Sequence, residues 1–388
     1  MIMQLCRAMC LAILFGSIAA ADEVKTLSGK SVVGTVVSLS DSVVLVKTPK
    51  GEEKVPLAQV LAVELRPAKG MGTEKYSDVR LLDDTVLHCT KVVLKGKDVQ
   101  LTLPSGTALS LPVNYVVSIW HEAQNAPLRK KWEELLAQRV KKDRIVVVKD
   151  GELNPLEGTI GEVDAEGKTV QFRRETGDVL PITLDRLNGM VFHRLEVPTT
   201  SPVCKVIDTQ GNTLMAVKVA FDGKKYQVTT SFAANVSLDP EALARLDFNM
   251  GKLTYLARPE KEPKAGTGIA GEGYVRDLAD APIAMDGQNF GRGVWARGPI
   301  ELEYNLDGKF KEFKAFLGVH PDFSVESKAV VTIFCDGEKR FSESPAKAMR
   351  AIAVNVKDVT TLKIVVTTPD PFNNLHAQAV LAEARVSQ

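Results

Sequence analysis

The sequence predicts an all-β protein, in which small β-barrel repeats with a single helix precede a jelly-roll β-sandwich. Short alternating strands recur in four related units, one segment has the apolar spacing of a helix, and after residue 266 the strands lengthen.

The chain has 388 residues, more than one domain usually contains, and its 45% hydrophobic and 25% charged residues exclude a disordered or collagen-like protein. Its 49 Lys and Arg against 48 Asp and Glu leave a net charge of +1, which gives no electrostatic basis for nucleic-acid binding.

Residues 1–21 are expected to be a secretory signal peptide that is removed by cleavage. Arg7 gives a weakly cationic start, residues 8–15 form a short apolar run, and Ala19-Ala20-Ala21 supply the small side chains that a signal peptidase requires before Asp22. The apolar run is too short to span about 30 Å of hydrocarbon. We therefore expect an exported protein, periplasmic or secreted, with no transmembrane segment after cleavage.

Four β repeats are expected at residues 22–70, 71–125, 144–196 and 197–252. The first three share a turn glycine, a kinked strand with a central proline and a closing apolar strand. The turn glycines are Gly51, Gly106 and Gly177, and the prolines are Pro56, Pro112 and Pro181. The fourth repeat is eroded, with Val236-Ser237-Leu238 in place of the proline anchor. Units with about five short strands bury a core only by curling into a small barrel.

The first repeat resembles an SH3- or Sm-type barrel in its strand pattern. Sm barrels bind RNA, but these strands lack a basic and aromatic stripe, so a scaffold or interaction module is the better expectation. One helix, at residues 126–143, interrupts the strands: Leu128, Trp132 and Leu135 share one face with Leu136 and Val140. We expect this helix to cover the second or third barrel, with Trp132 in the core.

Residues 253–388 are expected to form the sandwich. Alternating apolar residues give strands around Leu302, Ile333 and Ile364, and Asp307-Gly308 and Asp336-Gly337 are expected to be hairpin turns. Cys89, Cys204 and Cys335 remain after signal cleavage, an odd number in distant segments, so we expect small core residues or one chance pair.

This C-terminal portion resembles the NPCBM domain, a carbohydrate-binding type of module first described beside family 98 glycoside hydrolases. The matching stretches lie in the family's order and are Gly291–Val294, Ile300–Lys314, Phe316–Val319, Val330–Gly337, Val359–Thr367, His376-Ala377 and Ala382–Val386. The β repeats and the helix also resemble, more loosely, the N-terminal half of exported planctomycete-type proteins that carry this module.

The resemblance implies a galactose-binding-like sandwich with ligand contacts on loops at one end. Three positions depart from the family's pattern: Arg297 stands where histidine is usual, His320 stands where an acidic residue is usual, and no Asp-Trp pair follows His376-Ala377. Loop positions therefore differ from the family more than core positions do.

A sugar site needs an aromatic face for the apolar side of the ring and planar polar groups for the hydroxyls. The candidates for these roles, all expected on loops, are Trp295, Arg297, His320, Asp322, Asn373, Asn374 and His376. Packing between the sheets is an equal expectation for Trp295, and plain turn chemistry a stronger one for Asn373-Asn374. His320 and Asp322 alone do not make a metal site, so we expect no metal and no cofactor.

Catalytic signatures are absent from the sequence, because none of the five histidines stands in a triad or metal motif. We expect no enzyme. The first hypothesis is an exported, non-catalytic protein whose sandwich binds a glycan. The alternative is a structural or protein-interaction component of the cell envelope, with a protein partner and no sugar binding.

Overall fold

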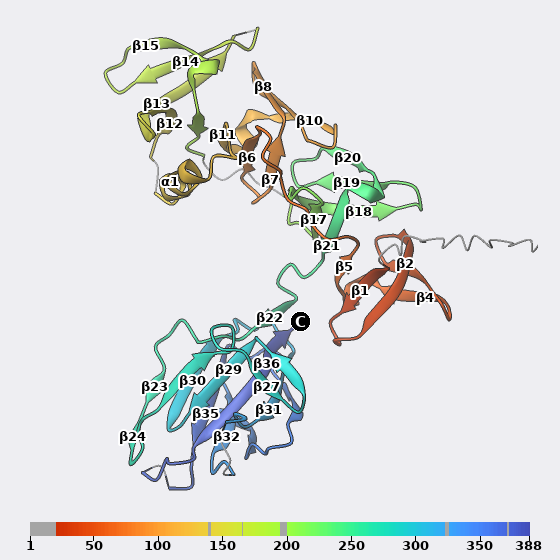
Figure 1. Cartoon of the computed structure of the whole chain (residues 1–388), viewed down its shortest axis with the longest axis vertical. Coiled ribbons are helices and arrows are strands. Elements are labelled where there is room, and N and C mark those ends of the chain that lie inside the picture. Colours follow the sequence, from red (N-terminus) through yellow and green to blue (C-terminus); the bar gives the residue numbers. More distant parts are fainter. Residues whose placement is uncertain (1–20, 139–140, 165, 195–199, 323–325, 371) are drawn as a thin grey trace, which may run out of the picture. The chain divides into compact units, whose positions relative to one another are not determined.

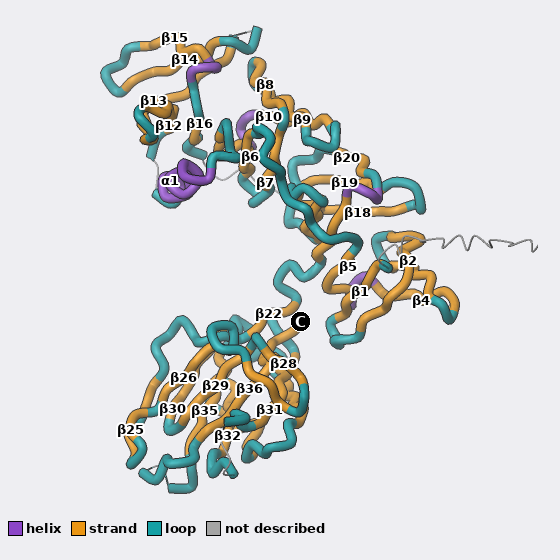
Figure 2. Tube along the Cα trace, viewed as in Figure 1, coloured by secondary structure: helices purple, strands orange, loops and turns teal. Residues whose placement is uncertain are grey.

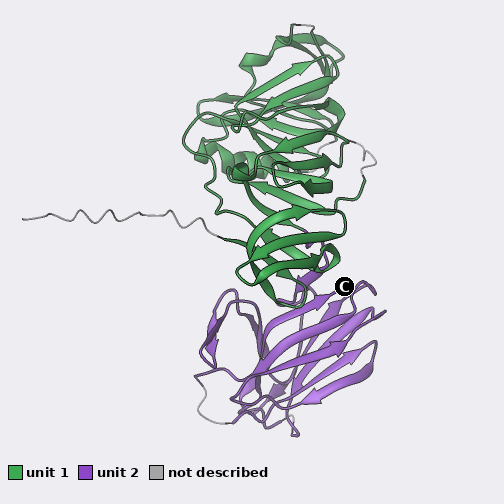
Figure 3. Cartoon of the chain, turned by 90° about the vertical axis from the view of Figure 1, so that its right-hand side faces the viewer, with its two compact units in different colours: residues 1–247 green, residues 248–388 purple. Residues whose placement is uncertain are grey.

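The computed structural model describes residues 21–138, 141–164, 166–194, 200–322, 326–370 and 372–388 (Figure 1). The predicted signal peptide, apart from Ala21, lies outside these residues. The chain divides into two compact units, Met1–Asp247 and Phe248–Gln388 (Figure 3). Strands dominate both units, which confirms the all-β prediction, and no helix in the described residues has the length and apolar character needed to cross a membrane.

The first unit contains four β repeats with a common plan (Figures 1 and 2). The first strand pairs with a bent second strand and with the closing strand, and a 3-10 turn precedes the closing strand. The first repeat holds β1 (Asp22–Thr26), β2 (Ser31–Leu39), β3 (Val43–Thr48), β4 (Gly51–Pro56), the turn Leu57–Gln59 and β5 (Val60–Glu64). The third holds β12 (Asp143–Lys149), β13 (Glu152–Val163), β14 (Thr169–Arg174), β15 (Val179–Thr183), the turn Leu184–Arg186 and β16 (Gly189–Val191). The fourth holds β17 (Cys204–Asp208), β18 (Thr213–Phe221), β19 (Tyr226–Thr230), β20 (Asn235–Leu238), the turn Pro240–Ala242 and β21 (Leu243–Asp247).

The second repeat differs because its second strand breaks at Thr90. It holds β6 (Ser77–Leu81), β7 (Val86–Cys89), β8 (Lys91–Lys95), β9 (Asp98–Thr102), β10 (Ala108–Pro112), the turn Val113–Tyr115 and β11 (Val116–Trp120). The two halves of the broken strand belong to different sheets, since β8 pairs only with β9 in a separate sheet of order β10-β9-β8. Strand β8 is therefore an edge strand.

Local chemistry explains why the repeats share this plan. The three predicted turn glycines, Gly51, Gly106 and Gly177, all have positive φ angles (123°, 83° and 91°). Residues with a Cβ atom rarely adopt this backbone conformation, which explains the glycines. At the bulge in the second strand, a backbone N–H is hydrogen-bonded by an aspartate carboxylate in both the first and the third repeat. Asp22 accepts a hydrogen bond from the Val36 N–H (2.8 Å), and Asp143 at the same position of the third repeat accepts one from the Ile160 N–H (2.8 Å).

The closing strands join the repeats in two pairs. Strand β5 of the first repeat pairs with β21 of the fourth, with Val63 opposite Leu246. Strand β11 of the second repeat pairs with β16 of the third, with Ile119 opposite Met190. These residues occupy the same position in each closing strand, so both pairs have the same antiparallel register and approximate two-fold symmetry.

Helix α1 (Ala126–Leu136) packs on both the second and the third repeat. Trp132 is 1% exposed and stacks on Trp120 with 4.7 Å between the ring centroids, so it is a core residue. The helix was expected to reach residue 143, but Asp143 begins β12 and caps the bulge described above. Val140, the last predicted residue of the apolar face, lies outside the described residues.

The second unit is a sandwich of two antiparallel sheets. The first, named here the β36 sheet, holds β26 (Tyr274–Asp277), β29 (Gly293–Arg297), β36 (Gln378–Ser387), β31 (Glu312–Gly318), β34 (Arg350–Asn355) and the short β22 (Leu253–Tyr255). The second holds β23 (Lys264–Ala265), β30 (Ile300–Asn305), β35 (Thr361–Thr367), β32 (Val330–Cys335) and β33 (Glu338–Glu343). Two small hairpins complete the unit, β24 (Thr267–Gly268) with β25 (Gly271–Glu272), and β27 (Ile283–Met285) with β28 (Gln288–Phe290).

The predicted apolar faces of the sandwich strands are confirmed, since Leu302, Ile333 and Ile364 are at most 1% exposed. Asp336-Gly337 is a hairpin turn between β32 and β33, as expected. The prediction of a hairpin at Asp307-Gly308 is wrong, because this turn carries the chain from β30 in one sheet to β31 in the other. The two strands pack their apolar faces against the same core from the two sheets on either side of it. Cys89, Cys204 and Cys335 are buried, and none of the three forms a disulfide.

The stacked indole rings beneath α1 predict a large cost for removing one of them. Trp132→Ala should lower the free energy of unfolding by about 3–5 kcal/mol, because it leaves a cavity against Trp120. Leu180→Ala is the control, since Leu180 is 38% exposed and its loss should change stability by about 0.5 kcal/mol or less. Urea unfolding followed by circular dichroism measures both; equal effects would contradict this packing.

Candidate functional site

The β36 sheet carries a second apolar layer on its outer face. Along β29 the side chains of Val294 and Ala296 enter the sandwich core, so the alternating Trp295 points to the outer side. The hairpin β27–β28 covers part of that side. The hairpin contributes Ile283, Met285 and Phe290 to a buried cluster that also contains Leu278, Val380 and Ala382, with Trp295, Phe316 and Met349 packed against it. Strand β36 is therefore covered on both faces along its first half.

A cavity of about 360 Å³ lies beside Trp295 and is named here the Trp295 cavity. It is lined by Arg276, Asp277, Leu278, Ala281, Trp295, His320 and Asp322. Trp295 meets His320 at 4.5 Å between ring centroids and Tyr274 edge-on at 5.5 Å. The Arg276 guanidinium lies 5.5 Å from the centroids of both the Trp295 and the Tyr274 rings. The indole is thus half-buried among two rings and a cation.

The polar groups of the cavity supply both donors and acceptors. Arg276 is exposed and makes no ion pair within the described residues, so its guanidinium is not committed to a carboxylate. The Asp322 side chain is 85% exposed, and its backbone N–H donates to His320 Nδ1 over 3.3 Å. Asp277 accepts a hydrogen bond from the Arg258 N–H with one oxygen. An aromatic wall with a guanidinium and carboxylates suits a hydroxylated ring.

The structure brings three of the seven predicted residues together. Trp295, His320 and Asp322 line the same cavity. The expectation that Trp295 and Arg297 lie on loops is wrong, because both belong to strand β29. The glycines at its ends do not open a loop: a Cβ at Gly293 would lie 2.1 Å from the Leu381 oxygen, so this glycine permits close pairing of β29 with β36. Arg297 stands over the Tyr274 ring at 5.5 Å but does not line the cavity.

The other three predicted residues lie in the loop before β36 and do not line the Trp295 cavity. Asn374 is completely buried: its Oδ1 accepts from the Ala270 N–H (2.8 Å), and its Nδ2 donates to the carbonyls of Gly271 (2.9 Å) and Gly298 (3.1 Å). Its side chain therefore holds neighbouring loops together and leaves no exposed surface for the predicted sugar contact. Asn373 is an exposed turn residue, and the His376 carbonyl accepts from Lys328 and Ser327.

Sequence reasoning missed Tyr274, Arg276 and Asp277. The signal for Tyr274 and Arg276 was the alternation of strand β26, in which Val275 is buried and its two neighbours face outward beside Trp295. Asp277, opposite the buried Val294, carried no such signal. The family resemblance drew attention to the stretches after Gly291, whereas β26 lies before them. Only strand pairing, with Arg276 opposite Trp295, brings this segment to the site.

The second unit is thus a β-sandwich with a cavity on the outer side of the β36 sheet. Residues 258–387 match the family model of the NPCBM/NEW2 domain, which confirms the resemblance found in the sequence. The second unit therefore contains an NPCBM/NEW2 domain. A comparison with curated proteins finds no match.

Solved structures of carbohydrate-binding modules are among the similar chains. The CBM51 module of Clostridium perfringens GH95, in complex with methyl-galactose, is 19% identical with a TM-score of 0.29, over 35% of this chain and 99% of that one. The CBM51-2 and INT domains of Clostridium perfringens ZmpB, in complex with GlcNAc, are 19% identical with a TM-score of 0.30, over 47% of this chain and 43% of that one. The tandem CBM51 modules of Sp3GH98 from Streptococcus pneumoniae are 11% identical with a TM-score of 0.28, over 94% of this chain and 87% of that one.

The buried amide of Asn374 predicts a structural effect for its removal. Asn374→Ala should lower the free energy of unfolding by about 2–3 kcal/mol, because buried backbone groups around Gly298 lose their partner. Asn373→Ala, at the exposed neighbour, should change it by about 0.5 kcal/mol or less. Thermal melts of both variants test this, and a stable Asn374→Ala protein would contradict the assigned role.

Proposed function

We propose that this chain is an exported, non-catalytic carbohydrate-binding protein that takes a sugar residue in the Trp295 cavity. The observation that carries the proposal is the meeting of an indole, a guanidinium and two carboxylates in one hollow of an NPCBM/NEW2 domain. Export rests on the apolar N-terminal segment and its small residues before Asp22. The β repeats would then present or space the sandwich.

The roles within the cavity follow from the chemistry of a pyranose. Its C–H face would pack on the part of the Trp295 ring that remains open beside Leu278. Its hydroxyls would accept from Arg276 and donate to Asp322, whose carboxylate is mostly exposed. Since His320 packs on the same indole, it would fix the orientation of the ring as well as contact the sugar.

Removal of the guanidinium tests the proposal with little risk to the fold. A glycan array probed with residues 22–388 should identify a ligand, and Arg276→Gln should weaken its binding by about 1.5–3 kcal/mol, the value of a hydrogen bond to a charged group. Isothermal titration of the identified glycan measures this.

Arg292→Gln is the matched control. Arg292 also stands over an aromatic ring, that of Tyr255 at 4.4 Å, but outside the Trp295 cavity, so its loss should leave glycan affinity unchanged. The absence of any ligand at millimolar glycan concentration, or equal losses in the two variants, would overturn the proposed site.

A protein-interaction role in the envelope is the second candidate, and one observation favours it. Ile269, Phe372 and Leu375 are 61%, 68% and 54% exposed. The first two lie on adjoining loops, joined by a hydrogen bond from the Ile269 N–H to the Phe372 carbonyl (2.7 Å). If the chain acts through this apolar group, Phe372→Ser should abolish association with an envelope protein and leave glycan affinity intact.

A further inference from the structure

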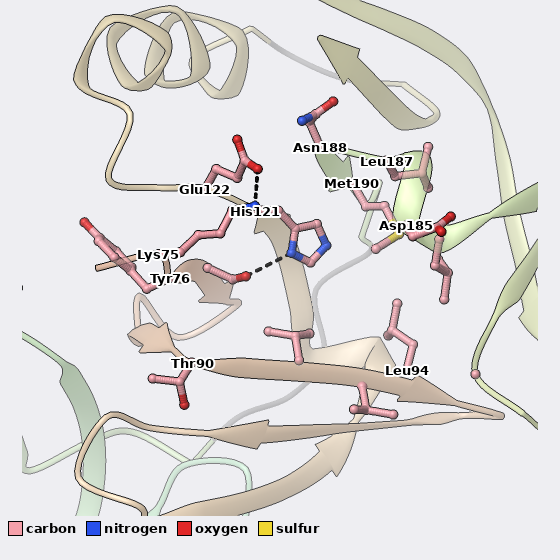
Figure 4. Close-up of a pocket in the computed structure, with 15 residues that line it drawn as sticks. Lys75, Tyr76, Thr90, Leu94, His121, Glu122, Asp185, Leu187, Asn188 and Met190 are labelled. Atoms are coloured by element: carbon pink, nitrogen blue, oxygen red, sulfur yellow. Dashed lines mark hydrogen bonds and ion pairs between the residues drawn. The ribbon is translucent and has the colours of Figure 1, made fainter. Parts of the chain in front are cut away.

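The second and third β repeats enclose a cavity of about 460 Å³, named here the His121 cavity (Figure 4). Its apolar wall comes from β8, the turn before β16 and β16 itself. Its lining includes Ser77, Val92, Val93, Leu94, His121 and Asn188. Figure 4 shows the His121 ring pointing inward, toward Met190 and Leu94. The volume lies in the range of ordinary ligand sites.

The other pair of repeats shows that the fold does not require polar groups here. In the second and third repeats the His121 N–H donates to the Asn188 carbonyl over 2.8 Å. The same bond in the first and fourth repeats runs from the Leu65 N–H to the Ala244 carbonyl, also over 2.8 Å. Leu65 and Ala244 are 5% and 2% exposed, so an apolar pair suffices at this position. His121 and Asn188 replace it with polar side chains beside an open space.

These polar side chains are held in place. His121 Nδ1 lies 2.9 Å from the Ser77 hydroxyl, and burial lowers the pKa of His121 below its ordinary value, so the imidazole is neutral at pH 7. Asn188 Oδ1 accepts from the Val148 N–H (2.7 Å), which leaves its amide N–H groups to other partners. A neutral ring, a hydroxyl and an amide favour a ligand with uncharged donors and acceptors.

The wall formed by β8 is a strand edge. Side chains alternate between the faces of a sheet, yet the consecutive residues Val92, Val93 and Leu94 all line the cavity. Val93 also lines a hollow of about 310 Å³ on the opposite face of the same small sheet. The Leu94 main-chain oxygen lies against Gly167, so the strand presents the main-chain edge of Val92 and Val93 between two hollows. Just beyond it, Gly96 already forms an isolated antiparallel bridge with Val163.

We propose that the β8 edge and the His121 cavity bind an extended peptide of a partner protein by strand addition. An extended backbone pairs in register with a row of main-chain donors and acceptors, and its alternate side chains would enter the two hollows. A sugar fits less well, because the aromatic ring at the cavity, Tyr76, is 7% exposed and packs edge-on against His88. His121 and Asn188 would bind peptide groups at the end of the added strand.

Charge indicates which peptide is preferred. Lys91 and Lys95, at the two ends of β8, are exposed, and neither makes an ion pair within the described residues. Lys75, at the cavity mouth, is already paired with Glu122. The partner segment should therefore carry acidic residues on both sides of an apolar side chain.

Random short peptides displayed on phage and panned against residues 22–388 test this proposal. Enriched sequences should alternate apolar and acidic residues, and a synthetic peptide of that sequence should protect the amides of β8 from hydrogen exchange. The double variant His121→Leu/Asn188→Ala, which restores the residue types of the other pair, should bind this peptide at least about tenfold more weakly. Failure to enrich any sequence, or protection elsewhere, would overturn the proposal.

A charge reversal keeps the test decisive if the double variant fails to fold. Lys91→Glu/Lys95→Glu changes only exposed side chains, and it should weaken the acidic peptide about tenfold while strengthening a version with lysines in place of its acidic residues. Lys47→Glu/Lys50→Glu, on exposed residues of the first repeat, is the matched control and should change neither affinity. Equal responses of the two charge-reversed proteins would contradict binding at β8.

Discussion

The candidate sugar site exists because the β27–β28 hairpin covers only part of the outer face of the β36 sheet. Strand β36 is apolar on both sides, so it requires a second hydrophobic layer in addition to the sandwich core. The β27–β28 hairpin supplies that layer, and it ends at Trp295. Because the Trp295 indole lies at the border of the buried cluster, one part of the ring is packed and another part can contact a ligand. The polar residues of β26 and of the loop after β31 complete the cavity around it.

The repeats of the first unit follow a different constraint. Each is too small to cover both edges of its closing strand, so the closing strands pair between repeats in one common register. The two pairs of closing strands therefore have the same register but different side chains beside it. Leu65 and Ala244 close it with apolar side chains, whereas His121 and Asn188, beside the broken second strand of the second repeat, leave a polar cavity. The two pairs of repeats share one strand pairing and differ in the residue types beside it.

The periodicity of apolar residues and the turn glycines in the sequence predicted the strand-rich fold and the positions of the repeats. Two-residue alternation identified the buried faces around Leu302 and Ile333, and the turn glycines located the repeats. The sequence could not show which strands pair, so Arg276 was missed although it lies opposite Trp295. It also could not distinguish an amide that contacts ligand from one that holds loops, because both are polar residues beside a turn, as Asn374 illustrates. Side-chain roles depend on tertiary partners, which periodicity does not encode.

The central claim is that carbohydrate binds at the Trp295 cavity. Nuclear magnetic resonance of the ¹⁵N-labelled chain during titration with the glycan identified on the array tests it most directly. If carbohydrate binds there, the resonances of the Trp295 indole N–H and of the Arg276 and Asp322 backbone amides should shift and saturate together, while those of the Trp120 and Trp132 indoles should not move. The second unit has another hollow, of about 530 Å³, lined by Tyr255, Arg258 and neighbouring residues. Shifts gathered there, with an unmoved Trp295 indole, would contradict the account.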